Sequence, residues 1–290
     1  MENAIYKINK YPDGSSYITL LNPVIDSTVS FTYRINSYED LWHLGLIMEA
    51  LTYNWMKANI TIPCLFDAQA DRRFEENQSA GLRTVCKFLN TMPDNTDDFL
   101  YRIYHPHNPE VIENVLEHYE LIDNSEFMID VLSGIGVYGE REAMGTVLMS
   151  SDAGGFKPLM KLCDKIEWNG ETYSASKARK WDYGEEKSIL TQIVDKEDFE
   201  GKDVVIVDDI CVYGGTFKGL SKLLRERNVG KLYLAVSHIT IQNHKGKDTV
   251  FDYFDKVFTT NSKFNNYWVE TFGGQPKQPE NLEIIKLFDI

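Results

Sequence analysis

The chain has 290 residues, of which 43% are hydrophobic and 26% charged, and its formal net charge is −14. These values are typical of a globular protein with one large α/β domain or two smaller ones. Nonspecific binding to nucleic acid or to an anionic membrane needs a cationic face, so the charge argues against both partners. The four cysteines form no CxxC pair, and there is no long apolar run or signal peptide. We therefore expect a cytoplasmic protein with free thiols.

The first third of the chain predicts a hairpin followed by a helix. Apolar and polar residues alternate through Ile5–Ile8 and Ser16–Leu20, and the turn sequence Tyr11-Pro12-Asp13-Gly14 lies between them. Apolar residues at helical spacing then run over Leu41–Lys57, with Ser37 as a capping residue ahead of them.

Short strands and helices alternate after this helix. Strands are predicted at 60–63 and 99–104, and amphipathic helices at 78–89 and 111–118. The loop Asp67–Arg73 follows the first strand, and His105–Pro109 follows the second. Charged residues, and two histidines that flank a proline, are also common in ordinary solvated loops. Only the order of these loops in the chain therefore favours a binding role for them over an ordinary solvated loop.

Two strand ends in the second half carry acidic residues. The buried strand Met144–Ser150 leads into Ser151–Gly155 (SDAGG), and Val204–Val207 leads into Asp208–Phe217 (DDICVYGGTF). Ligands of open α/β sheets lie outside the carboxyl ends of the strands. Glycines let a backbone close around phosphate, helix N-terminal amides favour an anion, and paired acids suit sugar hydroxyls or Mg²⁺. The pattern predicts a site for a phosphorylated sugar with a metal, although Asp-Asp or Gly-Gly alone would indicate only a strand cap or a turn.

Several further elements are expected around these motifs. Glu167–Tyr173 predicts a strand pair that turns at Asn169-Gly170. A basic cluster with Lys177 and Arg179 comes next, and by composition alone it would be surface charge. A helix follows over Phe217–Arg227. Strands are expected at 231–236, near 257–262 and at 282–287, the last of them docked on the sheet.

The stretch Val204–Thr216 resembles the phosphoribosyl-diphosphate loop of type I phosphoribosyltransferases and ribose-phosphate diphosphokinases, with Tyr213 in place of the first Thr of Thr-Gly-Gly-Thr. Ser150–Gly155 is similar to Ser-Pro-Asp-Ala-Gly-Gly of the diphosphokinases, with Ser151 in place of Pro. Weaker likenesses to the diphosphokinases occur in family order over roughly residues 5 to 262, at Tyr11–Gly14, Asp71-Arg72, His107 and Lys177 with Arg179. Phosphoribosyltransferases share only the Asp208 loop, so the diphosphokinases, also called phosphoribosyl pyrophosphate synthetases, are the better match.

The resemblance implies an α/β fold of two similar phosphoribosyltransferase-type domains, each a mainly parallel sheet flanked by helices. We expect an ATP-side domain over residues 1–138 and a domain with the ribose-phosphate loop over 139–290. A homo-oligomer, dimer or hexamer, is also implied, because the turn that resembles Tyr11–Gly14 contacts ATP bound to a neighbouring subunit. Ser15 replaces the Glu of that turn, Gln69-Ala70 replaces an Arg-Gln pair, and His105 replaces an acid.

The implied activity is Mg²⁺-dependent transfer of the diphosphoryl group of ATP to the anomeric hydroxyl of a ribose 5-phosphate moiety, with release of AMP. Lys177 and Arg179 would stabilise charge in the transition state, and His107 and Asp152 would hold Mg²⁺. The residues implied for ATP are Tyr11, Asp13, Gln69, Asp71, Arg72 and His107. Those implied for the ribose phosphate are Asp208, Asp209, Val212, Tyr213, Gly214, Gly215 and Thr216.

The large aromatic ring of Tyr213 favours an acceptor whose 5-phosphate continues into a nucleotide, on whose base the ring would stack. ADP-ribose is such an acceptor, and its 1-diphosphate would serve NAD synthesis or salvage, as in the phage-type branch of ADP-ribose pyrophosphate synthetases. Ribose 5-phosphate is the second possible acceptor, because a single Tyr could fold outward. A phosphoribosyltransferase without an ATP site, or a non-catalytic regulatory homologue, would also be consistent with these motifs.

Overall fold

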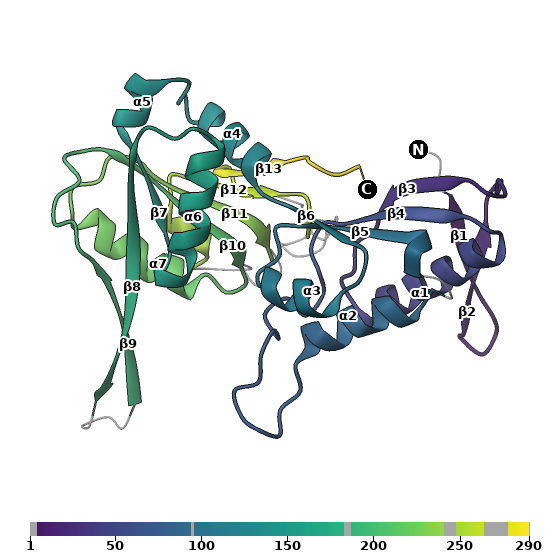
Figure 1. The fold of residues 1–290 in the computed structure, drawn as a ribbon. Helices are drawn as coiled ribbons and strands as arrows, with labels where there is room; N and C mark the ends of the chain where they lie inside the picture. Colours follow the sequence, from purple (N-terminus) through teal and green to yellow (C-terminus); the bar gives the residue numbers. More distant parts are fainter. Residues whose placement is uncertain (1–4, 94–95, 183–186, 241–247, 264–277, 290) are drawn as a thin grey trace. The chain divides into compact units, whose positions relative to one another are not determined.

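The computed structural model describes residues 5–93, 96–182, 187–240, 248–263 and 278–289 (Figure 1). The chain divides into two compact units, Met1–Asp123 with Phe288–Ile290, and Asn124–Leu287. The boundary expected at residue 138 therefore lies earlier. The reason is α4 (Ser125–Gly134), whose apolar side chains are buried in the second unit: Phe127, Met128 and Val131. Within the described ranges, no helix has the length and apolar character needed to cross a membrane.

The first unit combines a hairpin with a four-stranded parallel sheet. The hairpin pairs β1 (Tyr6–Lys10) with β2 (Ser16–Leu20), as predicted. The sheet has the order β3-β4-β5-β6, with bounds Thr28–Thr32, Lys57–Ile62, Phe99–Tyr104 and Tyr119–Ile122. The connections carry α1 (Tyr38–Tyr53), α2 (Gly81–Thr91), the 3₁₀ turn η1 (Thr96–Asp98) and α3 (Pro109–Val115).

Helix α1 begins and ends for identifiable local reasons. The hydroxyl oxygen of Ser37 accepts a hydrogen bond from the Asp40 amide at 3.1 Å, which caps the first turn as predicted. The helix ends at Tyr53, four residues earlier than the apolar spacing predicted. Trp55 takes a positive φ of 55°, and Lys57 already begins β4. The apolar side chains of α1, including Leu44 and Ile47, form the core of this unit with β4 and α2.

The second unit is a seven-stranded sheet of order β13-β12-β11-β10-β7-β8-β9. In chain order its strands are β7 (Thr146–Ser150), β8 (Glu171–Asp182), β9 (Lys187–Val194), β10 (Asp203–Cys211), β11 (Leu232–Ile239), β12 (Lys256–Thr260) and β13 (Leu282–Ile285). All neighbouring strands are parallel except β8 and β9. The expected docking of the last strand is confirmed, because β13 pairs with β12.

Helices cover both faces of this sheet. On one face α4 and α6 (Ala153–Lys165) pack on alternate residues of β10 and β11, and on the other face lie α7 (Gly215–Arg225) and the 3₁₀ turn η3 (Val250–Tyr253). The short helix α5 (Glu140–Met144) precedes β7. The four residues Val204–Val207 are buried, which confirms the prediction of a central strand covered on both sides.

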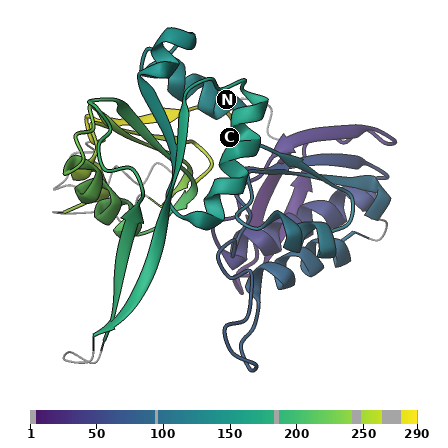
Figure 2. The same cartoon turned by 60° about the vertical axis from the view of Figure 1, so that its left-hand side comes forward.

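One predicted hairpin was wrong. Asn169-Gly170 is not a strand turn but the connection from α6 to β8, and β8 pairs in parallel with β7 from Glu171 to Ser174. A side chain at Gly170 would lie 2.4 Å from the Ala143 carbonyl oxygen, so the glycine permits a close approach of backbone. The antiparallel hairpin of this unit is formed by β8 and β9, which extend together beyond the sheet (Figures 1 and 2).

Candidate active site

The strand order of the second unit defines where a ligand would bind. From β7 the chain passes through α6 to β8 on one side, whereas β10 lies on the other side of β7 and leads through α7 to β11. The two helices lie on opposite faces of the sheet. Such a reversal leaves a crevice outside the carboxyl ends of the two central strands, and this is the usual ligand site of open α/β sheets. Asp152 and Asp208 both lie at this edge.

Asp152 is the residue after which α6 begins. Its carboxylate accepts a hydrogen bond from the Gly155 amide at 3.1 Å and so acts as the N-cap of the helix. The neighbouring Ser150 is fully buried and hydrogen-bonds to the Ser174 hydroxyl at 3.0 Å, which joins the ends of β7 and β8. The expected metal ligand Asp152 is therefore held at the crevice by its own helix.

Asp208 and Asp209 lie within β10, which continues to Cys211, because β10 keeps its pairing with β11 up to Ile239. The sequence pattern predicted that the strand ends before them. Asp208 accepts a hydrogen bond from the buried hydroxyl of Ser151, which thus spans the switch point from β7 to β10. The Asp208 carboxylate also accepts a hydrogen bond from the Asp209 amide at 2.9 Å. Both acids are half-buried and fixed by the sheet.

The electrostatics of this pair favour a ligand that brings a cation or hydroxyl donors. Burial and the negative charge of Asp209 raise the pKa of Asp208 to about 7, and the hydrogen bond from Ser151 opposes part of that rise. Asp208 therefore ionises less readily than an exposed carboxyl group does. Ribose hydroxyls or a divalent cation would supply the missing stabilisation of its charge.

The loop from Val212 to Thr216 is built to accept an anion. Gly214 has a positive φ of 72°, which a glycine adopts without steric cost, and α7 begins at Gly215. No side chain caps the helix, and a Cβ on Gly215 would meet only open space. Among the described residues, no capping side chain uses the first amides of α7, which suits an anion. The ring of Tyr213 is 73% exposed.

The backbone of the β8–β9 hairpin carries Lys177 and Arg179. Ser174 is the last β8 residue that pairs with β7, and Lys177 lies three residues beyond it, about 10 Å along the strand. Lys177 is opposite Gln192, and Arg179 is opposite Leu190, in the antiparallel register. The fold therefore brings these residues to a hairpin that leaves the sheet at the carboxyl edge, beside β7.

In the first unit, two of the predicted ATP loops meet. The Asp71 carboxylate accepts a hydrogen bond from the Asn108 amide at 2.7 Å, which joins the loop after β4 to the loop after β5. Asn108 also caps α3 and follows His107, which is exposed. Arg72 lies 5.4 Å over the exposed ring of Phe74, and Gln69 lies exposed in the same loop. Asp71, Arg72 and His107 thus share one edge of the sheet.

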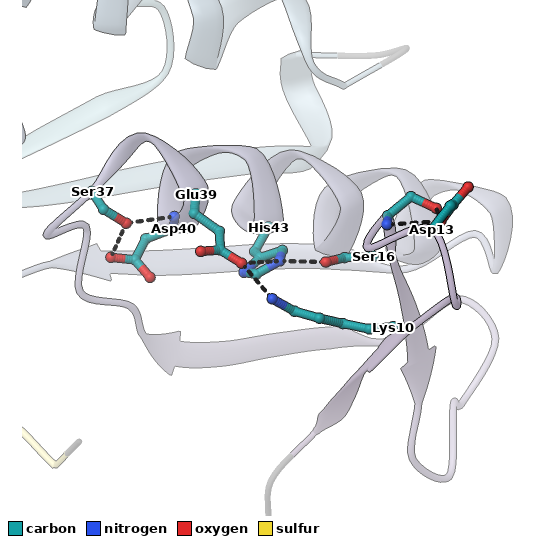
Figure 3. A network of polar contacts seen from close by, with 8 residues as sticks. Lys10, Asp13, Ser16, Ser37, Glu39, Asp40 and His43 are labelled. Carbon is teal, nitrogen blue, oxygen red and sulfur yellow. Dashed lines mark hydrogen bonds and ion pairs between the residues drawn. The ribbon is translucent and has the colours of Figure 1, made fainter.

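The turn at Tyr11–Gly14 joins β1 to β2, and Figure 3 shows its Asp13 near α1. Asp13 accepts two hydrogen bonds from Ser15, which lower the pKa of its carboxyl group, and the hairpin packs on α1. His43 on α1 hydrogen-bonds to Ser16 at 2.9 Å, and Lys10 pairs with Glu39 at 2.9 Å (Figure 3). These contacts place the hairpin that carries Tyr11 and Asp13 beside α1.

No group of three or more His, Cys, Asp or Glu side chains is arranged to hold a metal within the part of the chain that the structure describes. Mg²⁺ does not require such a cage, because it keeps several waters and binds through one or two carboxylates plus substrate phosphates. The carboxylates at the β7–β10 crevice fit this mode of binding. His107 and Asp152 belong to different units, so a metal shared by them stays a prediction.

Sequence reasoning missed the roles of Ser151 and Gln192. Ser151 stands where the family motif has a proline, and its contact with Asp208 depends on strand order, which one sequence does not reveal. The Gln192 side chain donates a hydrogen bond to the Thr216 carbonyl at 2.7 Å, and no local pattern marks it. Both contacts join segments that are distant in the chain.

Comparisons with known proteins agree with this geometry. Residues 135–276 match the model of the phosphoribosyl transferase domain. The ribose-phosphate pyrophosphokinase of Pyrococcus furiosus is 27% identical over 80% of this chain and 77% of its own, and that of Pyrococcus abyssi is 25% identical over 80% and 75%. The phosphoribosylpyrophosphate synthetase of Mycobacterium smegmatis superposes with a TM-score of 0.72 at 16% identity, covering 97% of this chain and 86% of that one.

The second unit therefore contains a phosphoribosyltransferase-type domain, with its ligand edge at the switch point between β7 and β10. The expected α/β class, with parallel sheets flanked by helices, is confirmed. Over most of its length the chain is also similar to ribose-phosphate pyrophosphokinases.

Proposed function

We propose that this protein transfers the β,γ-diphosphoryl group of ATP to the anomeric hydroxyl of a ribose 5-phosphate moiety and releases AMP. The observation that carries the proposal is the crevice between β7 and β10. There the acids of β10, the uncapped N-terminus of α7 and the hairpin with Lys177 and Arg179 belong to one edge of one sheet. The names of the relatives from Pyrococcus support the same activity.

Each part of the crevice has a role in this reaction. Asp208 and Asp209 accept hydrogen bonds from the ribose hydroxyls and so orient the anomeric oxygen for in-line attack. The amides of Gly215 and Thr216 hold the 5-phosphate at the start of α7. Lys177 and Arg179 stabilise the charge on the transferred group, and diphosphoryl transfer depends mainly on such positioning and electrostatics.

ATP binds to the first unit in this proposal, at the loops that the Asp71–Asn108 hydrogen bond holds together. Asp71, Arg72 and His107 contact the nucleotide, with Gln69 nearby. Tyr11 and Asp13 contact ATP of a neighbouring copy, which requires a homo-oligomer. Mg²⁺ would neutralise phosphate charge, with Asp152 as its ligand in the second unit and His107 as its ligand in the first unit each tested by itself.

We further propose that the acceptor is ADP-ribose. A free 5-phosphate suits a closed cradle of small residues. Tyr213 instead places a large aromatic ring in the loop, and this residue is 73% exposed. A 5-phosphate that continues into a nucleotide needs the cradle open on that side, and an exposed aromatic ring stacks on a base. Ribose 5-phosphate is the other acceptor to be compared.

The test is an assay with ATP, Mg²⁺ and either acceptor, in which AMP and ADP are separated. Release of AMP with either acceptor supports diphosphoryl transfer, whereas ADP alone refutes it. No turnover also refutes it and favours a non-catalytic homologue. A phosphoribosyltransferase would need no ATP and would release no AMP from it.

The ratio of kcat/KM for the two acceptors then decides the finer proposal. ADP-ribose should be preferred, and Tyr213→Thr should weaken that preference. Tyr138→Thr is the matched control, because Tyr138 is 77% exposed in the same unit but lies before α5, outside the loop. A preference for ribose 5-phosphate refutes the ADP-ribose proposal and leaves the diphosphokinase intact.

A further inference from the structure

The β8–β9 hairpin is attached to the sheet by polar contacts at its base. The Glu171 carboxylate accepts hydrogen bonds from Lys196, at 2.8 Å, and from Lys202. Arg227 donates hydrogen bonds to the carbonyl oxygens of Val194 and Lys196, where β9 ends. Beyond this base the two strands pair only with each other, from Ala175 to Asp182 in β8. The base is thus fixed, whereas no other strand among the described residues pairs with the rest of the hairpin.

Gln192 lies just beyond the base and contacts α7. Its side-chain amide donates a hydrogen bond to the Thr216 carbonyl at 2.7 Å, within the first turn of the helix. A Cβ added to Gly219 would lie 2.5 Å from the Gln192 side-chain oxygen. The Gln192 side-chain amide therefore packs against the first turns of α7. It occupies space that a side chain larger than glycine at position 219 would fill.

The same residue faces the hairpin's basic segment. Gln192 is the β9 residue opposite Lys177 in the antiparallel register, and Arg179 lies two positions further along β8. One side chain thus links the start of α7, where the ribose phosphate is proposed to bind, to the strand that carries both basic residues. Because Gln192 is held on both sides, a shift of the α7 N-terminus is passed to the hairpin at the position of Lys177.

We propose that Gln192 is a positioning residue that couples occupancy of the Val212–Thr216 loop to the placement of the β8–β9 hairpin. This inference rests on the proposed function of that loop. An anion at the α7 N-terminus orders the first turn, the Thr216 carbonyl becomes a fixed acceptor, and Gln192 then holds Lys177 and Arg179 at the crevice. Without acceptor the hairpin is held less firmly beyond its base.

The test is hydrogen–deuterium exchange of the full chain with Mg²⁺ and either ribose 5-phosphate or ADP-ribose, and without ATP, so that no turnover occurs. In the wild type, either ribose 5-phosphate or ADP-ribose should slow amide exchange both in residues 212–220 and in residues 187–194. In Gln192→Ala the slowing at 212–220 should persist, while that at 187–194 falls by roughly threefold or more, the scale of one lost hydrogen bond. Gln192→Glu keeps the length but not the donor, and should behave like Gln192→Ala.

Gly219→Ala is an independent variant that displaces the Gln192 amide without altering Gln192 itself. It should weaken the response at 187–194, although alanine favours a helix more than glycine does. In the Gln192→Ala background the same change should have no further effect, because the two residues act through one contact. In turnover, each single variant should lower kcat roughly three- to tenfold and change the acceptor KM little.

Two results separate the failure of this inference from the failure of the proposed function. Equal slowing at 187–194 in Gln192→Ala and wild type overturns the coupling while the loop remains a ligand site. No slowing at 212–220 with either probe in the wild type overturns the ribose-phosphate site, and the coupling with it.

Discussion

Replacing Glu171 by Gln should destabilise the second unit at neutral pH. Hydrogen bonds from Lys196 and Lys202 lower the pKa of Glu171 from its ordinary value of 4.5 to about 2. Such a difference corresponds to about 3 kcal/mol in favour of the ionised form. Because 35% of the Glu171 side chain is exposed, solvent screens the pairs, and we expect about 1–2 kcal/mol. The melting temperature should fall by about 2–8 °C.

The pH dependence follows from the direction of the pKa shift. The folded protein binds the Glu171 proton less tightly than the unfolded chain does, so the stabilisation is complete above about pH 4.5. It is lost as the pH falls from there toward 2. Calorimetric melting of wild type and Glu171→Gln between pH 7 and pH 3 should therefore give curves that converge at low pH.

Glu120→Gln is the matched control. Glu120 pairs with Arg102 at 2.8 Å, but the two side chains are 50% and 43% exposed. A surface pair of this kind contributes about 0.5 kcal/mol or less. If Glu171→Gln were as mild as Glu120→Gln at pH 7, or if its effect were the same at pH 3, the electrostatic account of the hairpin base would be refuted.

Three other predictions concern the site. Lys177→Ala and Arg179→Ala should each lower kcat by roughly 10²–10³-fold without changing the melting temperature. Near wild-type turnover in either variant would show that the residue is ordinary surface charge. Gly214→Ala should raise the acceptor KM and cost about 1–2 kcal/mol, because Gly214 has φ +72°. Gly201→Ala, at φ +76° in open space, should cost similar stability and leave KM unchanged. Light scattering should show a homo-oligomer, and a fully active monomer would contradict the role of the Tyr11–Gly14 turn.

Features set by neighbouring residues could be predicted from the sequence. The Ser37 cap, the turn at Tyr11–Gly14 and the buried strand before Asp208 each depend on a few adjacent side chains, and the structure contains all three. The acids and glycines of the candidate site were found for the same reason. Their residue types and order are local, whereas the crevice that they line is created by strand order.

Features set by distant partners could not be predicted. Asn169-Gly170 is a strong hairpin signal, but the carbonyl of Ala143 occupies the space beside it and the chain continues into a parallel strand. The pairing of β10 with β11 keeps Asp208 and Asp209 in the strand, although aspartate has a low propensity for β-strands. The contact of Ser151 with Asp208 likewise depends on which strands become neighbours.

The return of the chain to the first unit after β13 has a consequence for synthesis. Phe288 belongs to that unit, and its ring lies 5.1 Å from the ring of Tyr104 at the end of β5. Domains generally fold as they leave the ribosome, the N-terminal one first. Here the first unit receives this aromatic contact only after Asn124–Leu287 has been translated. Nascent chains stalled within the second unit should therefore lack the Phe288 contact of Tyr104, so the packing of the first unit is completed only at the end of translation.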